Sequence, residues 1–339
     1  MMDMRETVTF DDVLLVPQYS EVMSRKSISI ESSLDSKTTF ELPIISSPMD
    51  TITDSHMAAA LGAAGGLGII HRYNTIEEQC KHVESLPQDC PVGAAIGVTG
   101  DFLERAKALV LSGCDILCID VAHGHHALMR HALTTLRNTI GHDTHIMAGN
   151  VATLEAFNDL SDWGADSIRV GIGGGSICST RIQTGHGVPT LQSVIDCSAS
   201  DRSAVLVADG GIKTPGDIVK ALAAGADFVM LGSMLSGTSE TPGGWVYNNG
   251  EKYKAYRGMA SVEAQIDWRG HTSSVEGVSH VVPHKGPVKH ILGMLSNSIR
   301  SGLSYSGALN LADLRSKSKI IKQTSAGLAE SGTHIKMRY

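Results

Sequence analysis

The sequence contains few aromatic residues, no long uncharged apolar run and no surplus of basic charge. Phe, Trp and Tyr make up 4% of its 339 residues, which disfavours a surface for stacking the bases of single-stranded nucleic acid. No stretch approaches the roughly 18 uncharged apolar residues of a membrane-spanning helix. A formal net charge of -7 argues against nucleic acid as a partner, although a local basic pocket for a phosphate remains compatible with it. We therefore expect neither nucleic acid nor a membrane as a partner.

The six cysteines show no pairing pattern. They stand at positions 80, 90, 114, 118, 178 and 197 without a CxxC pair, and residues 1–10 lack the apolar core of a signal peptide. These two absences predict reduced thiols and a cytoplasmic protein. With 42% hydrophobic and 19% charged residues, the chain can bury a large core, in either one big α/β domain or two ordinary ones.

Short apolar runs of β type alternate with longer stretches of helical character. Asp101 and Thr214 are typical helix N-caps, Pro215 suits a first helical position, and Gly113, Gly164 and Gly225 are typical of helix C-termini. The expected strands are 42–46, 66–70, 92–96, 116–120, 145–148, 167–170, 205–208 and 228–231, and helices are expected at 101–112, 127–138, 154–163 and 214–224.

Eight such units predict an α/β fold with a parallel sheet, which closes most naturally into a (β/α)8 TIM barrel. A doubly wound open sheet is the alternative. It would be favoured by GxGxxG after the first strand, where the sequence has SSPMD instead. We expect one domain over residues 1–339, because no connection between the expected elements leaves room for an inserted domain.

Polar residues and glycines follow several of the expected strands, and in a barrel these strand ends meet at the rim where active sites lie. Residues 236–287, after the eighth strand, are too long for a simple connector and predict a mobile flap or lid. From residue 289 onward we expect a C-terminal extension that begins as an amphipathic helix.

The most unusual stretch is residues 171–187, GIGGGSICSTRIQTGHG, which follows an expected strand. Its glycines allow close backbone approaches that side chains would forbid. Cys178 adds a nucleophile, and Thr180 adds a hydroxyl. Taken alone, the stretch is equally compatible with a flexible turn. Cys114 and Cys118 stand beside the apolar run ILCID and fit buried structural positions better than Cys178 does.

Seven motifs together resemble the IMP dehydrogenase/GMP reductase family, and they follow that family's order over nearly the whole chain. They are SSPMDT (46–51), GGLGIIHR (65–72), IMAGNVAT (146–153), GIGGGSICSTR (171–181), ADGGIKTPGDI (208–218), GADFVMLGSML (225–235) and YRGMAS (256–261). The resemblance implies a barrel enzyme whose cysteine, Cys178 here, attacks C2 of a purine nucleotide.

The resemblance also implies roles for residues at matching positions. Thr180 and Glu276 would manage protons beside Cys178, and Asp209 would accept hydrogen bonds from the ribose. The substrate would contact Ser47, Met49, Ser176, Asp209, Gly211, Gly232, Ser233, Tyr256, Gly258 and Met259, with Ser176, Gly211, Gly232, Ser233 and Tyr256 at its 5′-phosphate. The cofactor would contact Asp120, His123, Gly124, Asn150 and Arg169, and a monovalent cation such as K+ would bind the carbonyls of Gly173, Gly175 and Cys178.

Two activities occur in this family. The dehydrogenase oxidises IMP to XMP with NAD and hydrolyses the covalent thioimidate with a flap that carries an Arg-Tyr pair, whereas the reductase releases ammonia from GMP and uses NADPH. Residues 258–277, GMASVEAQIDWRGHTSSVEG, form a short connection without an Arg-Tyr dipeptide. This favours GMP reductase, although SSPMDT, Ile182 and Val188-Pro189 look more like bacterial dehydrogenases.

Further expectations accompany the resemblance. The chain has no stretch that matches inserted CBS-type regulatory domains, and family members are commonly homotetramers. IMP dehydrogenase remains the alternative function, and a purine-nucleotide-binding regulatory protein without chemistry is a second alternative. His123, His125 and His126 lack a clear additional metal ligand, so we interpret them as a solvated run that faces the cofactor.

Overall fold

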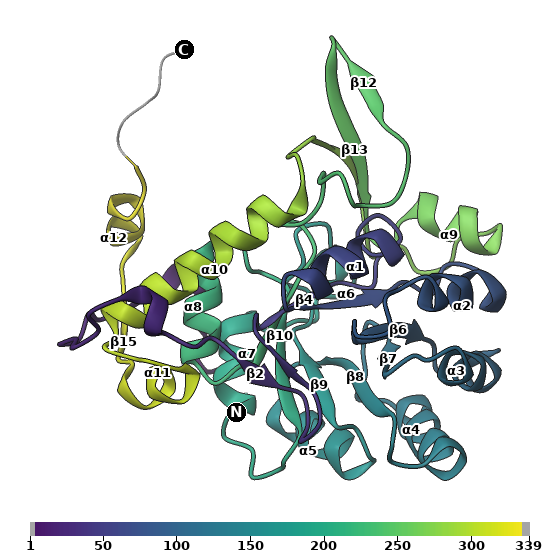
Figure 1. The fold of residues 1–339 in the computed structure, drawn as a ribbon, viewed down its shortest axis with the longest axis horizontal. Coiled ribbons are helices and arrows are strands. Elements are labelled where there is room, and N and C mark those ends of the chain that lie inside the picture. Colours follow the sequence, from purple (N-terminus) through teal and green to yellow (C-terminus); the bar gives the residue numbers. More distant parts are fainter. Residues whose placement is uncertain (1–3, 334–339) are drawn as a thin grey trace.

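The computed structural model describes residues 4–333, and a closed barrel of eight parallel strands forms its centre. The strands pair in chain order and the last closes against the first, which confirms the predicted TIM barrel and excludes the open sheet (Figure 1). They are β4 (Ile44–Ser46), β5 (Leu67–Ile70), β6 (Val92–Ile96), β7 (Ile116–Asp120), β8 (His145–Val151), β9 (Ser167–Val170), β10 (Val205–Asp209) and β11 (Phe228–Leu231).

Helices surround the barrel and connect its strands. Thr214 forms a capping box, because its hydroxyl accepts from the Asp217 amide while the Asp217 carboxylate accepts from the Thr214 amide. Asp101 occupies the predicted N-cap position, but its carboxylate accepts hydrogen bonds from Arg105 instead of capping the helix. The helices are α1 (Ser55–Ala63), α2 (Ile76–Glu84), α3 (Phe102–Leu111), α4 (Ala127–Ile140), α5 (Leu154–Asp162), α6 (Thr180–Thr184), α7 (Thr190–Cys197) and α8 (Pro215–Ala223).

Alternate residues of the strands build two separate apolar cores, because successive side chains of a strand point to opposite faces. The outward-facing residues pack against the helices in the larger core. The inward-facing residues fill the barrel interior, where Ile45, Ile69, Cys118 and Met147 belong to one cluster. On β9, the polar residues Ser167 and Arg169 alternate with Ile168 and Val170 of the outer core.

A short hairpin of β2 (Ser32–Ser33) and β3 (Thr39–Phe40) closes the N-terminal end of the barrel. Leu34 and Phe40 belong to the interior cluster, and the Phe40 ring meets the Phe228 ring edge-on at 5.8 Å. Asp35, in the turn, accepts from His145 Nδ1 at 3.2 Å, and His145 Nε2 lies 2.9 Å from Ser167 Oγ. The interior is therefore closed at this end and reachable only from the C-terminal ends of the strands.

The predicted flap region, residues 236–287, contains regular structure of its own. β12 (Val246–Asn248), β13 (Glu251–Arg257) and β14 (Ser279–Pro283) form an antiparallel sheet, and α9 (Val262–Arg269) lies between β13 and β14 in the chain. Figure 1 shows the β12–β13 hairpin projecting beyond the barrel.

The C-terminal extension begins with the predicted amphipathic helix, α10 (Val288–Tyr305), which buries Leu292, Leu295 and Ile299. It continues through α11 (Leu311–Lys317), β15 (Ile320–Lys322) and α12 (Ser325–Glu330). β15 pairs antiparallel with β1 (Val13–Leu15), which follows the 3-10 turn Phe10–Asp12, so segments from both ends of the chain lie side by side. The expected tail beyond residue 333 lies outside the described residues. Among residues 4–333, no helix is long and apolar enough to cross a membrane.

We expect Gly302→Ala to lower the free energy of unfolding by about 1–3 kcal/mol, because overpacking a tight helix contact costs that much. A Cβ at this position of α10 would lie 2.6 Å from Val219 Cγ2 of α8. Gly293→Ala, on the same helix, is the matched control: its Cβ would meet nothing within 4 Å, and alanine should stabilise the helix by up to about 1 kcal/mol. Urea unfolding of both variants checks this, and equal effects would contradict the tight α8–α10 contact.

A second expectation concerns pH. Burial lowers the pKa of His145 below 6.5 in spite of nearby Asp166 and Asp35, so protonation favours the unfolded chain and stability should fall as the pH drops below about 6.5. Burial opposes ionisation of Asp35, but the Lys37 and Thr38 amides hold its pKa below 3.8, so it stays charged in this window. His145→Gln should make the loss of unfolding free energy between pH 7.5 and 5.5 smaller. The exposed His142→Gln should leave that loss unchanged.

Candidate active site

A cavity of about 360 Å³ opens at the C-terminal ends of the barrel strands. The structure brings all residues predicted for catalysis and for the nucleotide into its lining, from segments up to 229 residues apart in sequence. Of the positions predicted for the cofactor, Asp120, Asn150 and Arg169 line it, and His123 and Gly124 do not. Gly173 and Gly175 also lie in its wall.

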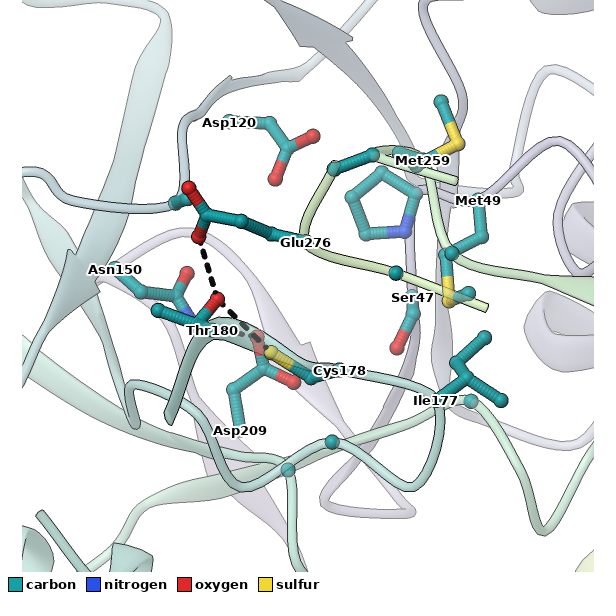
Figure 2. Close-up of a pocket in the computed structure, with 18 of the residues that line it drawn as sticks. Ser47, Met49, Asp120, Asn150, Ile177, Cys178, Thr180, Asp209, Met259 and Glu276 are labelled. Carbon is teal, nitrogen blue, oxygen red and sulfur yellow. Dashed lines mark hydrogen bonds between the residues drawn. The ribbon is translucent and has the colours of Figure 1, made fainter. Parts of the chain in front are cut away.

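Cys178, Thr180 and Glu276 form a chain of hydrogen bonds in this cavity (Figure 2). The Cys178 thiol donates to Thr180 Oγ1 at 3.2 Å, and this hydroxyl donates to Glu276 Oε2 at 2.7 Å. Both bonds point toward the carboxylate, so a proton that leaves the sulfur has a defined acceptor. The arrangement therefore connects the sulfur to a carboxylate oxygen through one hydroxyl, which is the kind of contact that activates a nucleophilic thiol.

Backbone contacts hold the two halves of this chain together. The Ser179 amide donates to the Glu276 carbonyl at 2.8 Å, and the Val278 amide donates to the Ile177 carbonyl at 3.0 Å. Cys178 and Gly277 form an antiparallel bridge between these bonds. Gly277 also passes close to Gly258, since a Cβ on Gly277 would lie 3.3 Å from Gly258 Cα and 3.1 Å from the Ser261 amide nitrogen. The glycine-rich loop and the base of the flap thus share one short strand pairing.

Hydroxyl groups gather on the wall beside β11 and β13. Ser176 Oγ lies 3.0 Å from Tyr256 OH, and a Cβ on Gly232 would lie within 3.5 Å of Ser47 Oγ and Tyr256 OH. Burial raises the pKa of Tyr256, opposed by its hydrogen bonds with Ser176 and Ser233, so the phenol keeps its proton. Hydroxyl donors around a glycine surface can bind phosphate oxygens.

Arg169 lies at the centre of the buried charges. Its Nη1 donates to Asp120 Oδ1 at 2.7 Å and its Nη2 donates to Asp209 Oδ2 at 3.0 Å. Burial opposes its charge, but Cys118, Asp120 and Asp209 raise its pKa still further above 12.5. Asn150 Nδ2 also donates to Asp209 Oδ2, at 2.9 Å. Arg169 therefore fixes the positions of the two carboxylates and compensates their charges.

The glycine-rich loop packs backbone to backbone against the loop after β10. Gly210 has a φ of +87°, and a Cβ there would lie 3.1 Å from the Gly175 amide nitrogen, so only glycine suits this contact. The loop is closed by a turn in which the Cys178 amide donates to the Gly175 carbonyl at 3.1 Å. Because a carbonyl oxygen has two lone pairs, this bond leaves the oxygen able to bind a cation as well.

His123 and Gly124 lie beyond the cavity. Gly124 is buried and its amide donates to the Asn150 carbonyl at 2.7 Å, whereas His123 is exposed. Its neighbours have structural contacts: His125 Nε2 lies 2.8 Å from Asp159 Oδ2, and His126 caps α4. Within residues 4–333 no three His, Cys, Asp or Glu side chains gather as a metal site.

The other cysteines differ from Cys178 in their surroundings. All six cysteines are free thiols. Burial raises the pKa of Cys114, Cys118 and Cys197 to about 12 in each case, so these thiols stay protonated and unreactive. The prediction that Cys114 and Cys118 are core residues is confirmed, since both are at most 5% exposed.

Sequence reasoning missed a set of residues that anchor the flap. Arg257 donates to Asp50 Oδ2 from Nη2 at 2.6 Å and to Asp267 Oδ2 from Nη1 at 2.6 Å, which ties β13 to the β4–α1 loop and to α9. Tyr73 OH donates to the Met259 carbonyl at 2.8 Å, and the Tyr73 ring stacks on Trp268 with centroids 5.6 Å apart. Arg257 and Asp50 belong to the motifs YRGMAS and SSPMDT and Tyr73 directly follows GGLGIIHR, but no sequence signal marked Asp267 or Trp268.

Fold and cavity together define a (β/α)8-barrel protein with a cysteine-centred site at the mouth of the barrel. A family model described as the IMP dehydrogenase / GMP reductase domain matches residues 7–334. The chain belongs to this family, whose members are oxidoreductases that use a nicotinamide cofactor.

Relatives with both activities are similar to this chain. It is 35% identical to inosine-5'-monophosphate dehydrogenase of Nitrosopumilus maritimus, over 98% of this chain and 99% of that protein. It is 33% identical to GMP reductase of Leishmania major, over 97% of each. These alignments span 474 and 476 positions, so both relatives contain residues without a counterpart among the 339 residues here.

A solved structure is also similar. The crystal structure of a cysteine-to-alanine variant of GMP reductase from Trypanosoma brucei, in complex with guanosine 5'-monophosphate, superposes with a TM-score of 0.94 at 30% identity. The match covers 98% of this chain and 99% of that chain.

We expect Arg257→Lys to loosen the flap, because lysine keeps the charge but loses the planar fork that reaches both carboxylates. Amide hydrogen exchange in residues 258–277 should become about 10-fold faster, the effect of losing about 1.4 kcal/mol. Arg202→Lys is the matched control, since Arg202 pairs with Asp162 and Asp201 at the surface and exposed pairs contribute little. Unchanged exchange in residues 258–277 would show that Arg257 does not anchor the flap.

Proposed function

We propose that the protein is a GMP reductase, which converts GMP to IMP and ammonia with NADPH through a thioimidate on Cys178. The observation that carries this proposal is the directed chain from Cys178 through Thr180 to Glu276, within a cavity closed by a short 258–277 connection without an Arg-Tyr dipeptide. The GMP complex of the similar structure supports a purine nucleotide as the ligand.

The first step forms a bond between sulfur and carbon. Cys178 loses its proton along the chain to Glu276, and the thiolate attacks C2 of the guanine. The same carboxyl group then returns a proton, through Thr180, to the 2-amino group. The C2–N bond breaks and ammonia leaves, which produces the thioimidate between Sγ and C2.

The second step consumes a hydride. The nicotinamide cofactor supplies this hydride to C2 when it is bound. The C2–S bond then breaks, IMP leaves and Cys178 regains its starting state. The sum is GMP, NADPH and one proton in, and IMP, NADP+ and ammonia out, so atoms and electrons balance without water as a reactant.

The cavity walls suit the two ends of the nucleotide. Ser176, Tyr256 and Ser233 offer hydroxyls to a 5′-phosphate, and Gly211 and Gly232 leave room for its oxygens. Asp209, held in position by Arg169, suits the ribose diol. Met259, whose carbonyl accepts from Tyr73, is held next to the position of the purine.

The remaining part of the cavity fits a dinucleotide. Asn150 Oδ1 is buried and has no hydrogen-bond partner among the described residues, so it is an available acceptor for an amide or hydroxyl donor. Asp120 and Arg72 lie on the same wall. We propose that Asp120, Asn150 and Arg169 orient the cofactor, that His123 and Gly124 shape the mouth beside it, and that Gly173, Gly175 and Cys178 offer carbonyls to K+.

One observation favours the dehydrogenase as a second candidate. Arg269 and Tyr73 both line the cavity, although they come from α9 and from the loop after β5. The fold thus brings an arginine and a tyrosine to the site without an Arg-Tyr dipeptide. The resemblance to the family implies that the dehydrogenase uses such a pair to hydrolyse the thioimidate. We further propose that the single-domain subunits form a homotetramer and that residues 236–287 form a mobile flap.

A direct assay tests the reaction. With GMP and NADPH the protein should oxidise NADPH and release one ammonia for each NADPH consumed, and with IMP and NAD it should produce little NADH. Reduction of NAD that depends on IMP, without oxidation of NADPH by GMP, would make the protein a dehydrogenase instead. Absence of both reactions in the presence of K+ would support the regulatory alternative.

Cys178→Ala should lower turnover by roughly 10³-fold or more, because it removes the nucleophile, while GMP binding by calorimetry persists. Cys80→Ala, at another half-buried cysteine, is the control and should keep full activity. Turnover that survives Cys178→Ala would contradict a covalent mechanism on this sulfur.

A further inference from the structure

Three arginines line the cavity, and they differ in how their charges are compensated. Arg169 pairs with Asp120 and Asp209, and Arg72 lies 3.9 Å from Asp120 Oδ2 and donates to the Asp120 carbonyl. Arg269 has no ion pair within 4.0 Å among residues 4–333 and donates no hydrogen bond there. Arg269 is exposed at the cavity wall, and no acidic side chain of residues 4–333 compensates its charge.

The surrounding carboxylates all bind other groups. Asp267, two residues earlier on α9, accepts from Arg257, as does Asp50. Glu276 accepts from Thr180, and Glu263 accepts from Ser279. Arg269 therefore stays available although acidic residues stand close to it in sequence.

The position of Arg269 is held by the flap. It ends α9, directly after Trp268, whose ring stacks on Tyr73 at an interplanar angle of 12°. Gln265, 2% exposed, accepts from the Ser273 amide at 2.8 Å and donates to the Ser274 carbonyl at 3.0 Å, which fixes the loop after α9. The positive charges of Arg72 and Arg269 both act to lower the pKa of Tyr73, although burial raises it overall. Arg269 thus lies on the Tyr73 and Arg72 side of the cavity.

We propose that Arg269 binds a phosphate of the nicotinamide dinucleotide. The guanidinium fork matches phosphate oxygens, and an uncompensated cation beside a nucleotide cavity gains most from such a partner. The 5′-phosphate of the purine nucleotide is proposed to bind at Ser176, in the glycine-rich loop, and at Tyr256, on β13. Arg269 lies instead on the side of the cavity with Tyr73 and Arg72. The identity of the cofactor in this assignment rests on the proposed function. The group that Arg269 binds is a phosphate of the dinucleotide, either the pyrophosphate or the 2′-phosphate of NADPH.

Kinetics with two cofactors separate these phosphates. Arg269→Gln should raise the KM for NADPH by about 10-fold or more, as expected for losing a charged hydrogen bond, with a small change in kcat. If the 2′-phosphate is the partner, the KM for NADH should stay constant. If the pyrophosphate is the partner, both KM values should rise equally. Arg269→Lys should recover part of the loss, and Arg130→Gln, at an exposed arginine of α4, should change nothing.

Binding without turnover provides an independent readout. NADPH and NADH can be titrated by calorimetry into GMP-saturated Cys178→Ala protein, with and without Arg269→Gln. The Kd for NADPH should rise about 10-fold in the Arg269→Gln protein, and the Kd for NADH should rise with it only if the pyrophosphate is the partner. Added salt should weaken NADPH binding less in the Arg269→Gln protein, because one charge pair is gone.

Two results would overturn the assignment. Unchanged Kd and KM for both cofactors would show that Arg269 touches no phosphate. A fall in kcat at constant KM and Kd would make Arg269 part of the chemistry, as in the dehydrogenase alternative. Failure of the proposed function is visible separately, in wild-type protein that reduces NAD with IMP. In that case NAD titrated into the IMP-saturated Cys178→Ala protein still tests the pyrophosphate contact.

Discussion

The site depends on one short backbone pairing between Ile177–Ser179 and Glu276–Val278. It joins segments almost 100 residues apart and lies directly beside the hydrogen bond from Thr180 to Glu276. Gly258 and Gly277 make the approach possible, because side chains at these positions would collide with neighbouring backbone atoms. Glu276, the proposed acid-base group, therefore comes from the flap region, while Cys178, the proposed nucleophile, comes from the loop after barrel strand β9.

Buried charge organises the rest of the cavity. Arg169 holds Asp120 and Asp209 at the ends of β7 and β10, and Arg257 holds Asp50 and Asp267 between the barrel and α9. Each arginine forms ion pairs with two carboxylates and so holds together segments that are distant in sequence. With these pairs formed, Arg269 is the cavity-lining arginine that has no ion pair within 4.0 Å among residues 4–333, which is why we propose it as a phosphate ligand.

The sequence predicted the barrel and most of the candidate site for a clear reason. All eight strand positions were recognisable because buried parallel strands are short apolar runs between turn residues. Residues at the ends of such strands must meet at one rim, so Cys178, Asp209 and Gly232 were found together. Glu276 was placed by resemblance, since no periodicity marks a carboxylate on an irregular flap. Asp101 takes the predicted N-cap position, but its carboxylate accepts from the Arg105 side chain and not from a backbone amide of the helix.

By itself, the sequence determined the fold and the family and predicted the nucleophile, since these follow from patterns within single segments: apolar periodicity, glycine spacing and motif order. The tertiary structure decided which groups touch. It aligned the hydrogen bonds from Cys178 through Thr180 to Glu276, separated His123 from the cavity and anchored α9 through Arg257. It also left Arg269 without an acidic partner within 4.0 Å in the part of the chain that the structure describes. These features depend on pairing between distant segments, and a hydrogen bond or ion pair is selected by distance in space, which no local pattern records.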